Sequence, residues 1–133
     1  MRDISRHRRR EAIRRRFRPK SVRLLFIGES PPVSGRFFYQ ADSGLYRAVL
    51  AAFLAYDCSF DGGDFLGKFQ NAGCYLIDLC SEPVDQLASN ERRAACRAGE
   101  AALTRTIARL RPKSIVTVVR SIETNVERAI QPA

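Results

Sequence analysis

Two carboxylates in this sequence stand where a protein can do chemistry on a bound ligand. Glu29 comes after the apolar run 22–27 and Gly28, and Asp78 lies near the end of a second apolar run, 74–79. Apolar runs without alternation are typical of buried parallel strands. Ligands bind at the carboxyl ends of such strands, so we expect both carboxylates at one binding edge and treat them as the candidate catalytic residues.

The loop after Gly28 carries further residue types suited to a binding site. Gly28 allows a sharp turn, and the prolines at 31 and 32 stiffen the loop and prevent an immediate helix. Three aromatic residues follow at 37–39 and offer faces for a planar ligand. A third apolar run ends at Arg120 and Ser121, where a helix begins and its N–H groups suit an anion. The candidate substrate-binding residues are Gly28, Ser30, Pro31, Arg36, Phe38, Tyr39, Arg120 and Ser121.

Each candidate also has a plainer structural interpretation. Glu29 can bridge a loop, Asp78 can cap the turn before Pro83, and Ser121 can cap a helix. At least one of the three aromatic residues is expected in the core, and an arginine such as Arg36 is often simply solvated. These alternatives stay open at the level of the sequence.

Apolar periodicity divides the chain into alternating strands and helices. We expect strands at 22–27, 74–79 and 114–119, and helices at 44–56, 90–111 and 121–130. Asp42 or Ser43 is expected to cap the first of these helices, and Asn90 the second. This order predicts an α/β protein, a three-layer α/β/α sandwich with a short central parallel sheet. Three strands make a narrow sheet, so we expect that its last strand is missing, either because the domain is C-terminally truncated or because the protein is naturally minimal.

Positive charge is concentrated at the N-terminus, and the sequence therefore divides into a basic arm, 1–20, and an α/β domain, 21–133. The arm holds 10 of the 23 Lys and Arg residues but only two of the 14 acids, and 1–18 can form a helix that ends at Pro19. Such an arm suits a phosphate backbone. A solvated or disordered tail is the main alternative, and acidic membrane lipid is a weaker one. The candidate phosphate-binding residues are Arg8, Arg9, Arg10, Arg14, Arg15 and Arg16.

Other classes of protein are excluded by composition. The single histidine, His7, lies in the arm, which rules out a mechanism that needs a histidine in the body. No apolar run is long enough to span a bilayer, and the N-terminus lacks the apolar core of a secretory signal. We therefore expect a cytoplasmic protein with no membrane association. The basic arm predicts a nucleic-acid partner, and no obligate protein partner is expected. The four cysteines show no C-x-x-C spacing, so no metal site is predicted.

Three segments, in order along the chain, resemble the uracil-DNA glycosylase superfamily. The segment 28–32 (Gly-Glu-Ser-Pro-Pro) is similar to the first motif of that superfamily, which holds the hydrolytic water. The segment 75–80 (Tyr-Leu-Ile-Asp-Leu-Cys) resembles the strand whose asparagine reads an extruded base. The segment 110–116 (Leu-Arg-Pro-Lys-Ser-Ile-Val) resembles the helix end and strand that precede the last motif.

This resemblance implies roles for single residues. Glu29 would position the water and stabilise the oxocarbenium-like sugar centre that forms when an N-glycosidic bond breaks. Phe38 would stack on the extruded base, and Arg36 would bind a phosphate beside it. Asp78 stands where asparagine is usual and can accept a hydrogen bond from an exocyclic amine. We therefore expect that uracil is not the preferred base.

The sequence departs from the superfamily at two further points. A His-Pro-Ser-like loop, the second catalytic motif, would follow a fourth strand that this chain does not contain. Several families carry a four-cysteine iron–sulfur cluster, and the 16-residue step from Cys80 to Cys96 resembles two of its ligands. Because no C-x-x-C pair supplies the other two, we predict no cluster and no other cofactor.

The expected function is therefore hydrolysis of the bond between deoxyribose and a damaged or deaminated base in DNA. Two alternatives remain. One is a non-catalytic nucleic-acid-binding module of the same fold. The other is a hydrolase of small molecules or nucleotides that uses the same strand-end site.

Overall fold

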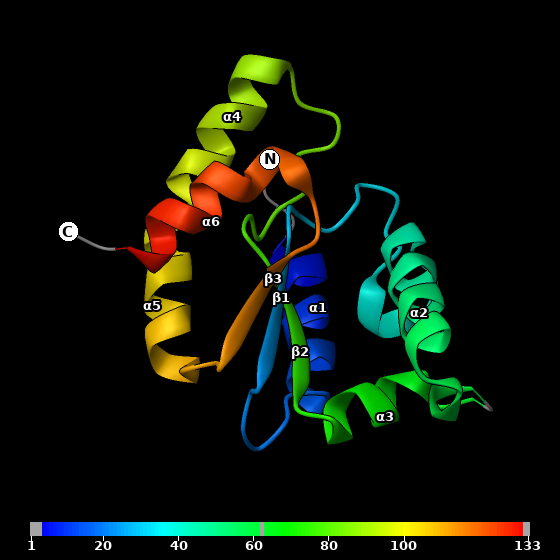
Figure 1. Ribbon diagram of the computed structural model, residues 1–133. Helices are drawn as coiled ribbons and strands as arrows, with labels where there is room; N and C mark the ends of the chain where they lie inside the picture. The colour runs from blue at the N-terminus through cyan, green and yellow to red at the C-terminus, as the bar shows by residue number, and fades with distance from the viewer. Residues whose placement is uncertain (1–3, 62, 132–133) are drawn as a thin grey trace.

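A parallel sheet of three strands forms the centre of the computed structural model, which describes residues 4–61 and 63–131 (Figure 1). The strands lie in the order β2-β1-β3, with β1 at Leu24–Gly28, β2 at Cys74–Asp78 and β3 at Ser114–Thr117. The α-helices are α1 Ile4–Arg16, α2 Gly44–Tyr56, α3 Phe65–Asn71, α4 Ser89–Ala98, α5 Glu100–Leu110 and α6 Glu123–Ile130. Short 3₁₀ helices are η1 Phe38–Gln40, η2 Cys58–Phe60 and η3 Arg120–Ile122.

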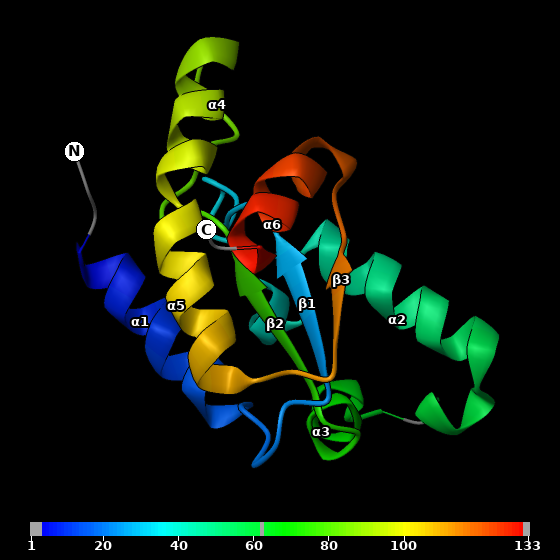
Figure 2. The ribbon, with the colours of Figure 1, turned by 60° about the vertical axis from the view of Figure 1, so that its left-hand side comes forward.

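Helices lie on both sides of the sheet, as the alternation of elements predicts. Figures 1 and 2 show α5 and α6 on one side and α2 and α3 on the other. Leu25 and Ile27 of β1 are completely buried, in agreement with the apolar run that predicts a central strand. The predicted α/β class and three-layer arrangement are confirmed. The strands are shorter than predicted, and β1 begins at Leu24 instead of Val22.

An aromatic cluster packs α2 and α3 against the sheet. Phe26 of β1 lies 6.0 Å from the ring of Phe53 and 5.3 Å from that of Phe69. Helix α2 has the bounds predicted from its apolar spacing, and the Ser43 hydroxyl accepts a hydrogen bond from the Tyr46 N–H at 3.1 Å. Ser43 is therefore the cap of this helix, one of the two residues considered for that position.

The single long helix predicted at 90–111 is wrong. Two helices, α4 and α5, meet at Gly99 and run in different directions (Figure 1). A Cβ atom at Gly99 would overlap the carbonyl oxygen of Leu79, so the chain passes the end of β2 at a distance that only glycine permits. The cap is also wrong, because α4 begins at Ser89 after Ala88 and not after Asn90. The last helix likewise starts later than predicted, because η3 precedes α6.

The basic arm folds onto the domain. Residues 4–16 form α1, and Phe17 directly after it stacks on Tyr39 with ring centres 5.2 Å apart. Ile13 also packs against the core. The helix expected within 1–18 is confirmed for these residues, and the alternative of a disordered tail is wrong for them. No helix in the described part of the chain is both long and apolar enough to cross a membrane.

We expect Gly99→Ala to lower the free energy of unfolding by about 1–3 kcal/mol, because its methyl group forces Leu79 or α5 to move. Chemical denaturation measures this change. Gly44→Ala is the matched control, since a Cβ there meets nothing closer than 3.8 Å and the position begins a helix. Equal stability of the two variants would show that the close approach of Gly99 to β2 is not a constraint.

Candidate functional site

A small hollow of about 220 Å³ opens at the carboxyl end of β1 and β2. Its walls come from the loop after β1, from the N-terminus of α2 and from β2 itself. We call it the strand-end hollow. It is lined by Ser30, Pro31, Pro32, Phe37, Phe38, Ser43, Gly44, Leu45, Leu76 and Asp78.

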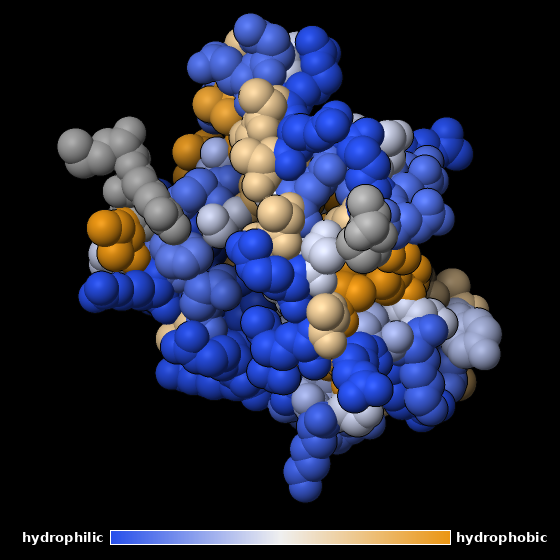
Figure 3. All heavy atoms as spheres, turned by 90° about the vertical axis from the view of Figure 1, so that its left-hand side faces the viewer, coloured by the Kyte–Doolittle hydropathy of each residue, from blue (hydrophilic) through white to orange (hydrophobic). Residues whose placement is uncertain are grey.

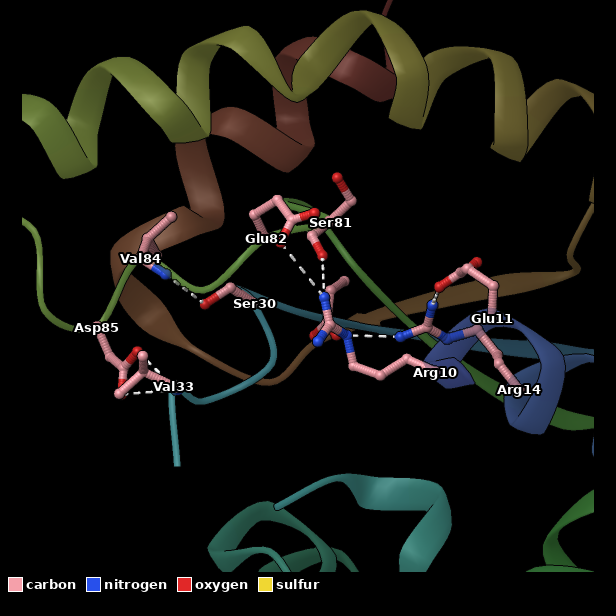
Figure 4. A network of polar contacts seen from close by, with 10 residues as sticks. Arg10, Glu11, Arg14, Ser30, Val33, Ser81, Glu82, Val84 and Asp85 are labelled. Atoms are coloured by element: carbon pink, nitrogen blue, oxygen red, sulfur yellow. Dashed lines mark hydrogen bonds and ion pairs between the residues drawn. The ribbon is translucent and has the colours of Figure 1, made fainter. Parts of the chain in front are cut away.

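Hydrogen bonds fasten the loop after β1 to the loop after β2 (Figure 4). The Leu79 and Cys80 N–H groups donate to the carbonyl oxygens of Gly28 and Glu29, both at 2.8 Å, which extends the pairing beyond the strands. Further out, the Ser30 hydroxyl accepts from the Val84 N–H at 3.2 Å. The Val33 N–H donates to Asp85 at 3.1 Å. The proline-containing loop is therefore held in place on one side of the hollow.

Two of the three consecutive aromatic residues face the strand-end hollow. Phe37 and Phe38 line it, and the Phe37 N–H donates to Asp42 Oδ1 at 2.7 Å. Tyr39, a predicted substrate-binding residue, instead lies in the core, where its hydroxyl accepts a hydrogen bond from the Leu76 N–H at 2.7 Å. The Phe38 ring packs edge-on against the Tyr39 ring, with ring centres 4.9 Å apart. Tyr39 thus supports the wall from behind and does not form it.

Asp78 supplies the carboxylate of the strand-end hollow. Its side chain is only 8% exposed, and Oδ2 accepts a hydrogen bond from Arg14 Nη2 at 3.1 Å. Oδ1 lies above Gly28, 2.8 Å from where a Cβ atom of that residue would stand. Burial raises the pKa of Asp78 to about 6, although the Arg14 charge opposes this shift. Glu29 contributes only weakly to the raised pKa of Asp78.

Glu29 does not face the strand-end hollow. Arg92 of α4 holds its carboxylate with two hydrogen bonds, one from Nη2 and one from Nε at 2.8 Å. The Cys96 thiol donates to Oε2 at 3.6 Å. The hydrogen bond from Arg92 lowers the pKa of Glu29, which burial alone would raise. The two carboxylates, expected at one binding edge, therefore line different cavities.

Strand geometry explains this separation. Gly28 pairs with Asp78 in the parallel register, and side chains of paired residues project from the same face of a sheet. Leu76, two residues before Asp78, therefore lines the same hollow. Glu29 is one residue beyond Gly28, so its side chain projects from the opposite face. Both carboxylates reach the same edge of the sheet but on different sides of it.

A second, larger cavity of about 740 Å³ lies on the Glu29 side, between α4 and α6. Ser121, predicted to bind substrate, lines this cavity, whereas Arg120 is exposed at the start of η3. Figure 3 shows that the side of the molecule formed by α4, α5 and α6 is mostly hydrophilic. The lining residues are Glu29, Ser89, Arg92, Arg93, Ala94, Cys96, Arg97, Ser121, Thr124, Asn125 and Arg128.

The arginines of α1 have three different environments. Arg9 and Arg10 line a basic cleft of about 230 Å³ against the loop after β1, together with Arg36. Arg10 Nη2 also donates to the Ser81 carbonyl at 3.0 Å, as Figure 4 shows. Arg14, also predicted to bind phosphate, is instead buried and paired with Asp78. The arginines of α1 that are exposed outside this cleft are Arg8, Arg15 and Arg16.

Two cysteines also meet near Glu29. Cys80 and Cys96 are buried, with their sulfur atoms 3.8 Å apart. Within the described residues, no group of three or more His, Cys, Asp or Glu side chains is placed to hold a metal ion. Two thiols are too few for the four-cysteine cluster of some superfamily members, so the residues here do not fit that cofactor.

Sequence reasoning missed the residues that control the two carboxylates. Arg92 is 63 positions from Glu29 and Arg14 is 64 positions from Asp78, so neither pairing follows from spacing. Phe37 lines the strand-end hollow but was not among the predicted substrate-binding residues. The sequence could have indicated it, because it belongs to the aromatic run 37–39. Ser43, the cap of α2, also lines the strand-end hollow. The apolar spacing of α2 predicts where this helix begins and so could have indicated Ser43.

The buried Asp78 carboxyl gives a testable pH dependence. Its pKa of about 6 exceeds the ordinary value of 3.8, so protonation favours the folded protein. The free energy of unfolding of the wild type, minus that of Asp78→Asn, should fall as pH rises from about 4 to 7, by on the order of 1–3 kcal/mol. Glu29 titrates in both proteins, so its contribution to the free energy of unfolding cancels in this difference. Urea denaturation across this range checks the difference, and a constant difference would contradict the burial of Asp78.

Comparison with known families agrees with this architecture. The uracil DNA glycosylase superfamily matches residues 15–128 of the chain. No curated protein and no solved structure matches it. The match spans the sheet, the strand-end hollow and both carboxylates, and a small parallel sheet between helices is consistent with the fold of that superfamily. The chain belongs to the uracil DNA glycosylase superfamily.

Proposed function

We propose that this chain binds an extruded base of DNA in the strand-end hollow and hydrolyses the bond between that base and its deoxyribose. Members of the superfamily act on DNA. The observation that carries the proposal is the meeting of the Phe37 and Phe38 rings with the Asp78 carboxylate in one hollow. Enzymes that act on a base take it out of the stack, hold it on aromatic side chains and read its edge by hydrogen bonds.

The dimensions of the strand-end hollow suit one heterocyclic base. Its volume of about 220 Å³ lies below the range of about 300–1,000 Å³ that is typical of drug-sized ligands. Apolar and aromatic side chains make up most of the wall, and among the described residues Asp78 is the acidic one that lines it. An ionised carboxylate only accepts hydrogen bonds. Asp78 therefore favours an N–H group that is not flanked by carbonyl oxygens on both sides, as the N3–H of uracil is, in keeping with a substrate other than uracil.

Glu29 is the proposed water-positioning residue. In the reaction, a water oxygen attacks C1′ of deoxyribose, the C1′–N bond breaks and its electron pair leaves with the base. A carboxylate beside the sugar accepts a proton of the water and later releases it to solvent, and the departing base takes up a proton from solvent. The lowered pKa of Glu29 keeps its carboxylate ionised, as this role requires. Arg92 now holds both carboxylate oxygens, and the Glu29 side chain lies on the other side of the sheet edge from the strand-end hollow. Arg92 must therefore release Glu29, and the Glu29 side chain must turn toward the hollow, before Glu29 can bind the water.

The basic cleft beside the loop is the proposed phosphate site. Pro32 lines both this cleft and the strand-end hollow, so the two are neighbours. Arg9, Arg10 and Arg36 in its wall can neutralise the phosphates next to an extruded nucleotide. The exposed Arg8, Arg15 and Arg16 extend the positive field along α1.

A non-catalytic DNA-binding module is the second candidate function. The observation in its favour is the double hydrogen bond from Arg92 to Glu29, which occupies the carboxylate needed for hydrolysis. In that case the strand-end hollow would still hold a base, and Glu29 would only tie the loop to α4.

Glu29→Gln separates the two candidates. If the chain is an enzyme, wild type releases free base from oligonucleotides that contain uracil, hypoxanthine or xanthine, and Glu29→Gln is slower by about 10²- to 10⁴-fold. The affinity of the variant for the same oligonucleotides should be retained. Single-turnover base release and fluorescence anisotropy measure the two quantities. Binding without release by wild type would identify the module, and fastest release of uracil would overturn the expected base preference.

The phosphate site is tested by the salt dependence of DNA affinity. We expect Arg9→Gln and Arg36→Gln each to reduce the slope of log affinity against log salt by about one, because each variant loses a phosphate contact. Lys113→Gln is the matched control, since Lys113 precedes β3 at the opposite edge of the sheet. If all three variants keep the wild-type slope, DNA does not occupy the basic cleft.

A further inference from the structure

Arg14 of α1 contacts two walls of the strand-end hollow from inside the protein. The residue is 8% exposed, in contrast to its exposed neighbours Arg15 and Arg16. Its Nη2 donates to Asp78 Oδ2 at 3.1 Å, and its guanidinium carbon lies 5.2 Å from the centre of the Phe37 ring. That distance is within the range of a cation–π interaction. One side chain therefore fixes both the carboxylate and a ring of the hollow.

Stability alone explains this arrangement poorly. Removing two charges from water costs free energy that their attraction often fails to recover, so a buried ion pair is weak evidence of stabilisation. Arg14 Nε is also buried, and residues 4–61 and 63–131 offer it no hydrogen-bond partner, which adds a further cost. A buried charge kept at such cost invites a functional explanation.

We propose that Arg14 is a positioning residue for base recognition, which holds Asp78 as a hydrogen-bond acceptor with Oδ1 left to the ligand. The described residues supply no hydrogen bond to Oδ1, whereas Oδ2 is engaged by Arg14. The hollow then selects bases with an N–H group that is not flanked by carbonyl oxygens on both sides. This inference rests on the proposed base-binding function. Arg14 precedes residues 15–128, the segment that matches the superfamily, so α1 adds this feature from outside the matched segment.

The charges around Asp78 support this role for Arg14. Arg14, Arg10 and Glu11 face it from α1, and Glu29 approaches from the end of β1. Arg14 is the strongest of these influences and lowers the pKa of Asp78, while Glu11 acts in the opposite direction. Without Arg14 the buried carboxyl should become protonated near neutral pH. It would then also donate a hydrogen bond, so that the hollow would bind base carbonyl groups as well.

Two substitutions with opposite effects test the positioning role without DNA. The ¹³C resonance of the Asp78 carboxyl reports its titration directly. We expect Arg14→Gln to raise the titration midpoint by about one pH unit or more, and Glu11→Gln to lower it. Arg14→Lys keeps the charge and should restore most of the wild-type midpoint. Glu11 is partly exposed, so its variant remains informative if Arg14→Gln fails to fold. Unchanged midpoints in the folded variants would overturn the proposal.

The second measurement is base affinity as a function of pH. We expect the affinity of wild type for an oligonucleotide containing hypoxanthine to fall as pH drops through about 6, where Asp78 takes up a proton. The midpoint of this fall should move up in Arg14→Gln, and Asp78→Asn should show no such dependence. If the carboxyl midpoint moves in Arg14→Gln but no DNA binds at any pH, the proposed base-binding function fails and Arg14 controls only the carboxyl. A pH profile that Arg14→Gln leaves unchanged contradicts the inference itself.

Discussion

The parallel register between β1 and β2 is the constraint on which the site depends. It pairs Gly28 with Asp78 and continues one step further through the hydrogen bond from Cys80 to Glu29. Since side chains alternate between the two faces of a strand, consecutive positions at this edge serve opposite sides of the sheet. Asp78 meets the aromatic rings beneath α2, while Glu29 meets α4. The same sheet edge thus places Asp78 and Glu29 in two different electrostatic environments.

The two carboxylates differ in pKa because their surroundings differ. Asp78 is surrounded by apolar walls, and a single arginine only partly offsets the loss of water. Glu29 keeps more contact with solvent and receives two hydrogen bonds from Arg92. Burial therefore dominates at Asp78, and hydrogen bonding dominates at Glu29. Environments that separate the pKa values of two neighbouring acids are a recurring feature of sites that use them for different tasks.

Local sequence signals predicted the elements of the fold, and they failed where a distant contact decided the outcome. The apolar face of α2 and its Ser43 cap lie within one segment, and both were predicted. The break between α4 and α5 at Gly99 could not be predicted from local sequence. The backbone angles of Gly99 are helical, and the break follows from its close approach to Leu79, which is distant in sequence. Arg14 was indistinguishable in sequence from its exposed neighbours until the fold brought α1 to Asp78. The alternation of side chains at Gly28 and Glu29 was readable from the sequence and was overlooked.

The close approach of Asp78 to Gly28 also restricts how this site can change over evolutionary time. No side chain fits at position 28 while a carboxylate oxygen occupies the space above it. A larger residue at 28 is tolerable only if residue 78 becomes shorter or turns away. Among descendants of this chain, these two positions should therefore vary together, and a change at one of them alone would alter the shape of the strand-end hollow.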